Sequence, residues 1–346
     1  MRNNPHRDVE RGKILARSYD YVIVGAGSAG CVVARRLLDG TDATVLLLEA
    51  GGPVEDIKSL SNPPQWIENI GSRYDWSYRY EPSPLVDHRS LPLPLGKVLG
   101  GSGSINAMVW TRGHRADYDG WAEAGNAGWD FHSVLPLFQK AEDWEDGASE
   151  FRGAGGPIHV ERARDLDPVS AAFIDAGQSY GMPYFDDVNI PEPEGVGPFS
   201  LNVRDGARCS PFLAYLRPVM GHRNLTVRTE AQVVKLTLSG TRCTGLDFLQ
   251  DGQLHSVGAS REVVLCAGRS TRRAYSCCPA SVHVLTSSGS ASAPSSTSRA
   301  WGGTSRITSG CTASASRPST RAPPRITISA AASPSGEVGL RWAGQT

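Results

Sequence analysis

The segment at residues 20–37, DYVIVGAGSAGCVVARRL, constrains the fold more than any other part of the chain. Its first apolar run, YVIV, predicts a short buried strand of a parallel sheet. Gly25, Gly27 and Gly30 then form the pattern GxGxxG, and apolar residues follow at helical spacing. Such glycines permit a tight strand-to-helix turn, a close approach of the backbone to a pyrophosphate, and close packing of helix on strand. The segment therefore predicts a unit that holds a phosphate at the start of its helix.

A second strand and an acidic residue follow at the spacing of a dinucleotide site. Residues 43–48, ATVLLL, predict a buried strand, and Glu49 comes directly after it, nineteen residues beyond Gly30. An acid at this place accepts hydrogen bonds from a ribose. The alternative is a solvated strand end, but the full order of strand, glycines, helix, strand and acid favours the ribose contact. We predict cofactor contacts at Gly25, Gly27, Ser28, Ala29, Gly30, Glu49 and Ala50.

The fingerprint alone does not decide between FAD and NAD, but the chain after Glu49 differs from a plain NAD-binding domain. A glycine-rich turn leads into a long stretch rich in proline and aromatic residues, instead of continuing the alternation of strand and helix. The block GKVLGGSGSIN follows at residues 96–106, with Trp110, Gly113 and Asp119 after it. An NAD enzyme is disfavoured by this block.

This second block resembles the first signature of the glucose–methanol–choline (GMC) flavin oxidoreductases. Three further segments resemble the choline dehydrogenase and alcohol dehydrogenase branch of that family: RGHRADYDGWAEAGNAGWDFHSVLPLF at 112–138, EGVGPFSLNVRDGARCSPFLAYLRP at 194–218, and NLTVRTEAQVVKL at 224–236. The resemblance runs from about residue 18 to Gly268. It implies an FAD cofactor and a small-molecule alcohol substrate.

The resemblance also implies further cofactor contacts. Consecutive glycines at 100 and 101 would let the backbone lie against the ligand without a Cβ clash. A flexible Gly/Ser linker is the alternative, but it fits poorly with the apolar residues inside the block. By resemblance, Val233 binds adenine through its backbone, although it could simply pack in the core. The additional implied contacts are Val98, Gly101, Asn106, Ala107, Met108, Val109, Val233 and Ala267.

The expected fold class is α/β. A Rossmann-like FAD-binding domain with a mixed sheet would comprise residues 19–165 and 225–268, incomplete relative to the family. A partial α+β substrate-side cap would comprise residues 166–224. Residues 1–18 would form an N-terminal extension, and residues 269–346 a disordered C-terminal tail.

Composition changes sharply at the start of that tail. Residues 269–346 contain nine arginines, no lysine and a single acid, Glu337, so this part carries a net charge of +8 within a chain of net charge zero. A basic, serine-rich tail is typical of disorder or of an acidic partner. A nucleic-acid tether is disfavoured because the tail has no lysine and few aromatic residues among its arginines.

The remaining residues limit the other function classes. Seven scattered cysteines without a CxxC pair or a His/Cys cluster favour reduced thiols, a cytoplasmic location and no metal site. The polar N-terminus predicts no signal peptide, and no apolar run predicts a membrane span. The sequence does not indicate the oligomeric state. In the family, a histidine near the C-terminus is the catalytic base, but His283 lies in unrelated surroundings. We therefore assign no catalytic residue.

The second family signature, close to GAINSPxLLxLSGIG, is expected directly after VVLCAG, where the chain instead continues RSTRRAYSCCPAS. Codons can be chosen for these thirteen residues, together with the start of the next codon, so that a second reading frame carries the family signature. Read from its third nucleotide, such a sequence encodes INSPRLLMLSGIG. The tail from Arg269 is therefore interpreted as a frameshifted translation. The chain would then belong to the alcohol or choline-type dehydrogenases by family but be inactive. The alternative is a non-catalytic flavin-binding fragment or a decayed gene product.

We expect the gene, across the codons for Ala267 to Ser270, to continue in a neighbouring frame into INSPRLLMLSGIG. Sequencing genomic DNA and several independent clones through this junction checks the frame. Genomic DNA that cannot encode this peptide in any frame would exclude a frameshift.

Overall fold

The computed structural model describes residues 17–54, 57–268, 331–332 and 338–339. The chain divides into two compact units, Met1–Ser292 and Ala293–Thr346. In the second unit, β15 (Ala331–Ala332) and β16 (Val338–Gly339) form an antiparallel pair. Most of the expected N-terminal extension and nearly all of the expected disordered tail lie outside the described residues.

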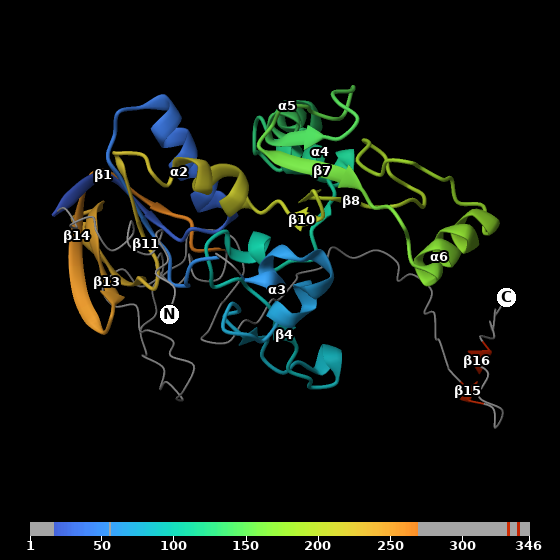
Figure 1. The fold of residues 1–346 in the computed structure, drawn as a ribbon, viewed down its shortest axis with the longest axis horizontal. Coiled ribbons are helices and arrows are strands. Elements are labelled where there is room, and N and C mark those ends of the chain that lie inside the picture. Colours follow the sequence, from blue (N-terminus) through green and yellow to red (C-terminus); the bar gives the residue numbers. More distant parts are fainter. Residues whose placement is uncertain (1–16, 55–56, 269–330, 333–337, 340–346) are drawn as a thin grey trace. The chain divides into compact units, whose positions relative to one another are not determined.

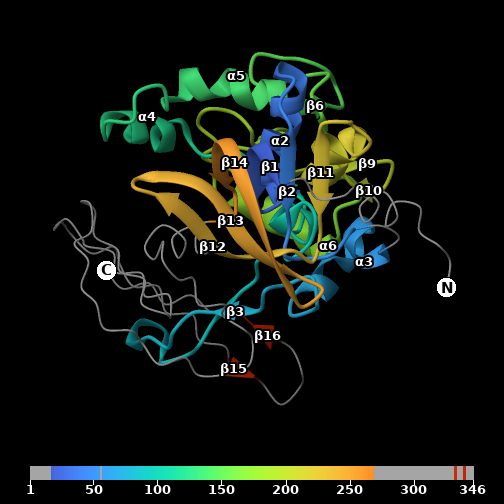
Figure 2. The same ribbon diagram turned by 90° about the vertical axis from the view of Figure 1, so that its left-hand side faces the viewer.

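A six-stranded mixed sheet is the main element of the first unit, with strand order β11-β2-β1-β14-β13-β12 (Figures 1 and 2). β11, β2, β1 and β14 run parallel, whereas β14, β13 and β12 pair antiparallel. Their bounds are β1 (Ser18–Val24), β2 (Val45–Leu48), β11 (Leu225–Arg228), β12 (Gln232–Ser239), β13 (Arg242–Gln250) and β14 (Gln253–Leu265). The mixed α/β fold agrees with the class expected from the sequence.

The first strand is apolar on both sides because both faces of the sheet are covered. Ile23 points into one hydrophobic cluster, whereas Val22 and Val24 belong to the cluster on the other side. This alternation follows from the two-residue period of a strand. The predicted buried parallel strands around the glycine-rich turn are therefore confirmed.

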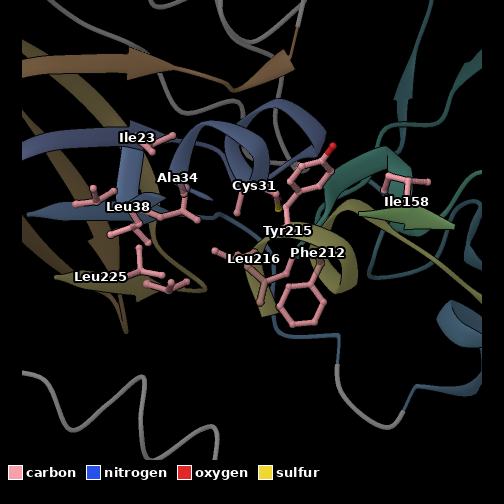
Figure 3. Packing of buried hydrophobic residues seen from close by; sticks show 14 of the residues in the cluster. Ile23, Cys31, Ala34, Leu38, Ile158, Phe212, Tyr215, Leu216 and Leu225 are labelled. Atoms are coloured by element: carbon pink, nitrogen blue, oxygen red, sulfur yellow. The ribbon is translucent and has the colours of Figure 1, made fainter. Parts of the chain in front are cut away.

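The cluster that contains Ile23 lies between the sheet and two helical segments (Figure 3). Helix α2 (Ser28–Gly40) contributes Cys31, Ala34 and Leu38 to this cluster. A π-helical turn, η4 (Phe212–Leu216), adds Phe212, Tyr215 and Leu216, and the short η5 (Arg217–Val219) follows it. The packing fixes the orientation of α2 and thereby the position of its N-terminus at the end of β1.

A second region is built on a four-stranded sheet, β5-β8-β7-β6. Its strands are β5 (Val109–Trp110), β6 (Glu142–Trp144), β7 (Ile158–Arg162) and β8 (Ser200–Leu201). The helices of this region are α4 (Arg115–Glu123), α5 (Phe131–Ala141) and α6 (Pro168–Ser179). Strands β5, β6 and β7 precede residue 165, the expected end of the first FAD-binding segment, and β8 follows it. The domain boundaries expected from the sequence stay predictions.

Short elements connect these two regions and complete the described part of the chain. They are α3 (Lys58–Ser61), η1 (Pro63–Asn69), β3 (Tyr78–Arg79), η2 (Pro84–Val86), β4 (Pro92–Leu93), η3 (Gly101–Ser104), β9 (Val203–Arg204) and β10 (Ala207–Arg208). Within the described ranges, no helix combines the length and apolar character needed to cross a membrane.

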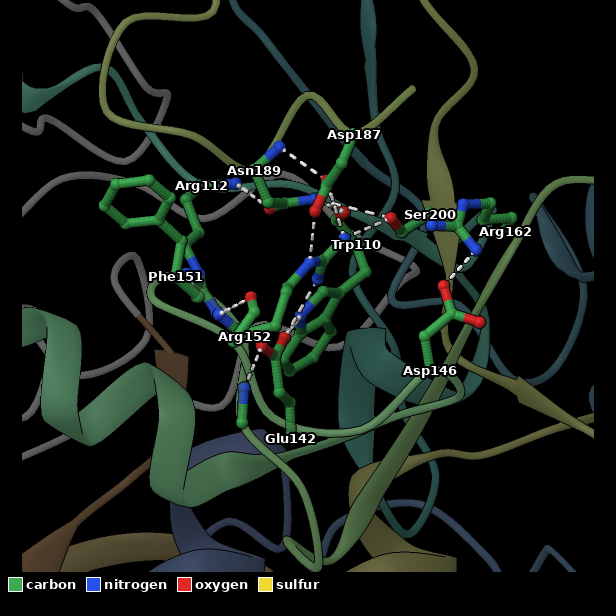
Figure 4. A network of polar contacts seen from close by, with 12 residues as sticks. Trp110, Arg112, Glu142, Asp146, Phe151, Arg152, Arg162, Asp187, Asn189 and Ser200 are labelled. Atoms are coloured by element: carbon green, nitrogen blue, oxygen red, sulfur yellow. Dashed lines mark hydrogen bonds and ion pairs between the residues drawn. The ribbon is translucent and has the colours of Figure 1, made fainter. Parts of the chain in front are cut away.

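The second region has a charged interior (Figure 4). Fully buried Glu142 accepts hydrogen bonds from Arg112 at 2.7 Å and from Arg152 at 3.0 Å. Arg152 in turn donates to both carboxylate oxygens of Asp187, at 2.7 and 2.9 Å. Arg112 and Arg152 thus each have a carboxylate partner, which offsets the large cost of removing their charges from water.

Candidate dinucleotide site

The first glycine loop joins β1 to α2 through close backbone contacts. Gly25 has φ +94°, and a Cβ at this position would lie 2.7 Å from the Cys266 carbonyl oxygen. A Cβ on Gly30 would lie 1.9 Å from the Gly25 carbonyl oxygen. A side chain at either place would force the strand and helix apart. The packing role predicted for the third glycine is confirmed.

The start of α2 is open to an anion. Its cap is Gly27, no side chain among the described residues caps it, and its first turn holds no acid. Ser28 and Ala29 are exposed there. The free N–H groups of a helix start, together with the helix dipole, favour a negatively charged ligand. This arrangement fits the diphosphate of a dinucleotide.

The second glycine loop packs directly on the first. The Gly100 N–H donates to the Ala26 carbonyl at 2.7 Å. Gly101 has φ +56°, and a Cβ on it would lie 2.7 Å from the Cα of Gly27. The structure shows that Gly101 makes room for the backbone of the first loop, and the expected contact of these glycines with a ligand stays a prediction. The two glycine motifs, about seventy residues apart in the sequence, form one cradle in which the backbones meet at Gly27 and Gly101.

Glu49 lies at the carboxyl end of β2, next to both loops. Its two carboxylate oxygens accept hydrogen bonds from the Ala26 N–H at 2.8 Å and the Gly51 N–H at 2.9 Å. The residue is only 6% exposed, so the alternative of a solvated strand end is wrong. Burial raises the pKa of Glu49 to about 7, although the amides of Gly51 and Ala26 act in the opposite direction.

The other segments with implied contacts meet at the same edge of the sheet. The Ala231 N–H donates to the Glu49 carbonyl at 2.8 Å, which brings the start of β12, and with it Val233, to this edge. The Cys266 N–H donates to the Val24 carbonyl at 2.8 Å, which places Ala267 beside Gly25. Open α/β sheets bind ligands outside the carboxyl ends of their parallel strands, and this is the end that these segments surround.

Accessibility divides the predicted contact residues into three groups. Exposed residues are Ser28, Ala29, Asn106 and Val109; half-buried residues are Gly25, Gly27, Ala50, Ala107 and Ala267; buried residues are Gly30, Glu49, Val98, Gly101, Met108 and Val233. Val98 is fully buried and packs with Leu60 and Ile105, so it belongs to the core beneath the loop. The cofactor contacts themselves stay predictions.

One residue that sequence reasoning missed reaches this site from β10. Arg208 is 2% exposed, and its guanidinium contacts the loop at residues 103–106. The available signal was the Asp-Gly pair at 205–206, typical of a hairpin turn, with one basic residue two places beyond it. That pattern predicts the hairpin but not the partner of the arginine.

Fold and site together define a dinucleotide-binding protein of the Rossmann-like class, with a second glycine loop added to the usual fingerprint. A family model described as GMC oxidoreductase matches residues 19–294. The chain belongs to the GMC oxidoreductase family, in its choline and alcohol dehydrogenase-like branch, as the sequence indicated. The match extends beyond Gly268, where we expected the resemblance to end, into residues outside the described structure.

Individual proteins agree with this assignment. The chain is 42% identical over 259 residues to the mitochondrial choline dehydrogenase of Mus musculus, covering 72% of this chain and 43% of that protein. The crystal structure of pyridoxine 4-oxidase from Mesorbium loti is similar with a TM-score of 0.69 and 39% identity, covering 72% of this chain and 49% of that one. An FAD-dependent oxidoreductase from Chaetomium thermophilum is similar with a TM-score of 0.66 and 26% identity, covering 72% and 46%.

These comparisons identify the cofactor as FAD, and the residues present fit it. The uncapped start of α2, the glycine-rich cradle and the acid at the end of β2 suit a diphosphate flanked by a ribose. The chain spans less than half the length of the relatives named above.

Substituting Gly101→Ala should prevent the two glycine loops from packing. The new Cβ would meet the Gly27 backbone at 2.7 Å and would also force alanine into a left-handed conformation. We expect a loss of about 3 kcal/mol in the free energy of unfolding, measured in urea. Gly240→Ala is the matched control, because its φ is +60° with nothing near its Cβ. The control should lose only about 1 kcal/mol, and equal losses would contradict the loop contact.

The FAD-free chain should become less stable as pH rises, because folded Glu49 then loses the proton that it holds at low pH. The folded chain holds a proton on Glu49 up to a pKa of about 7, whereas the unfolded chain releases it near the ordinary value of 4.5. The contribution is therefore fully present below about pH 4.5 and is lost as pH rises through about 7. Urea unfolding of the wild type and Glu49→Gln across this range measures it. A constant difference between the two proteins would disprove the raised pKa.

Proposed function

We propose that this chain binds FAD through the cradle formed by its two glycine loops. The observation that carries the proposal is the convergence of these loops, Glu49 and the start of α2 at the carboxyl ends of parallel strands. The α2 amides would hold the diphosphate, and Glu49 would accept hydrogen bonds from a ribose. The segment from Asn106 to Val109 would lie beside the flavin.

By family, the chain derives from an oxidoreductase that acts on CH–OH groups of alcohols or choline-type substrates. The chemistry that FAD supplies when bound is acceptance of the hydride from the alcohol carbon. A base must also remove the hydroxyl proton. Two described histidines have structural partners: His114 caps α4, and His159 lies 3.1 Å from Asp143. We assign the base to neither.

We further propose that the family signature expected after Gly268 is encoded in a neighbouring frame, and that the chain therefore does not turn over alcohols. The segment RSTRRAYSCCPAS, which stands where that signature is expected, supports this proposal. A second candidate is a flavin-binding fragment whose role is not catalytic. Both candidates require FAD binding. They differ in whether the product of a frame-corrected gene turns over alcohols. A cytoplasmic location remains a prediction from the cysteines.

Purified full-length chain should carry flavin visible in its absorption spectrum and released in about equimolar amount on denaturation. Anaerobic addition of choline or a primary alcohol should leave the spectrum unchanged, because the proposed frame change removes the segment that carries the family's catalytic base. A gene restored to the neighbouring frame after Gly268 is the control, and its product should bleach. Bleaching of the uncorrected chain would overturn the proposed inactivity. A folded chain that binds no added FAD would overturn the cofactor assignment, and a corrected chain that stays oxidised would favour the non-catalytic fragment.

A further inference from the structure

Arg208 joins three segments that are distant in the sequence. From β10, its Nε donates to the Leu60 carbonyl at 2.9 Å, at the end of the short helix α3. Its Nη1 donates to Asn106 Oδ1 and its Nη2 to the Asn106 carbonyl, both at 2.7 Å. A longer contact of 3.4 Å reaches the Gly103 carbonyl. The rigid fork of the guanidinium is suited to holding two oxygens of one residue.

The charge of Arg208 has no carboxylate partner among the described residues. Burial alone lowers the pKa of its guanidinium to about 10, with no neighbouring charge acting on it. Arg152 is equally buried, but it is paired with Glu142 and Asp187. A buried charge without a counter-charge is costly. The site therefore maintains a positive charge directly beneath the second glycine loop.

Arg208 also fixes the orientation of the Asn106 side chain. Asn106 Oδ1 accepts hydrogen bonds from Arg208 and from the Met108 N–H at 3.1 Å. Because both bonds use the amide oxygen, the amide nitrogen is left to donate elsewhere. Asn106 is exposed, and within the described part of the chain no acceptor pairs with this nitrogen. The hydrogen bond from the Met108 N–H to Asn106 Oδ1 also holds the turn after Asn106, in which Met108 has φ +61°.

We propose that Arg208 is a positioning residue that directs the Asn106 amide nitrogen, as a hydrogen-bond donor, toward the flavin half of FAD. The inference rests on the proposed FAD binding and adds the group that orders the flavin side of the site. The adenosine and diphosphate half is held by other residues, at the start of α2 and at Glu49. Loss of Arg208 should therefore weaken binding of the flavin half selectively.

The test compares the affinities of the full-length chain for FAD and for ADP, which has the adenosine and diphosphate but no flavin. Arg208→Met should weaken FAD binding tenfold or more, since it removes hydrogen bonds from a charged donor, while ADP affinity changes less than about twofold. Arg204→Met is the matched control, because Arg204 lies on the same hairpin, is half exposed and pairs with Asp143 at the surface. The control should bind both ligands as the wild type does.

Asn106→Asp provides a second variant that keeps the chain folded. The new carboxylate pairs with Arg208 and preserves the clamp, but the amide donor is gone. FAD affinity should fall about as far as in Arg208→Met, without a fall in the Tm of the FAD-free chain, and the double variant Arg208→Met, Asn106→Asp should lose little more.

Three outcomes decide the inference. Wild-type chain that binds neither ligand refutes the proposed function. Wild-type chain that binds both, with Arg208→Met weakening both equally, shows a purely structural arginine and overturns the inference. FAD binding by Asn106→Asp at wild-type strength overturns it as well, whatever the stability of the Arg208→Met protein.

Discussion

The contact between the backbones of Gly27 and Gly101 is the constraint on which the rest of the site depends. The two loops can approach this closely only because Gly101 has no side chain, since a Cβ on it would lie 2.7 Å from the Gly27 Cα. Once they meet, the first loop fixes the start of α2, and the second fixes the turn that leads to Asn106. The site is thus an arrangement of backbone amides and carbonyls, which explains why glycine dominates both motifs.

The fold around the nucleotide could be predicted well because its signals are local. A continuous apolar run, a glycine turn and helical spacing are consecutive in the sequence, and the parallel strands and α2 follow from them. The position of Glu49 was equally predictable from its distance to the glycines. Its burial was not, because the amides that enclose it come from Ala26 and Gly51, and their approach depends on the folded loops.

The polar contacts of long range could not be predicted from the sequence. Arg208 looks like one more surface arginine, and its partners are more than a hundred residues away. The pairing of Glu142 with Arg112 and Arg152 in the second region spans only 30 and 10 residues, but it has no sequence signal either. Charged residues carry no periodic pattern that marks them as buried, so only the assembled structure distinguishes these arginines from their neighbours. The packing of Gly101 on Gly27 could not be predicted either, because these residues are far apart in the sequence.

The place of β14 in the sheet has a consequence for how the chain is made. Of the six strands in this sheet, β14 is the last to be synthesised, yet it lies in the middle, bonded to β1 on one side and β13 on the other. Before Leu265 leaves the ribosome, the parallel strands and the hairpin of β12 and β13 are two separate pieces. The change of frame that we propose would fall just beyond that point, after the joining strand has been supplied. A gene damaged there can still produce a nascent chain with all six strands of this sheet, whereas damage a dozen codons earlier would leave it in two parts.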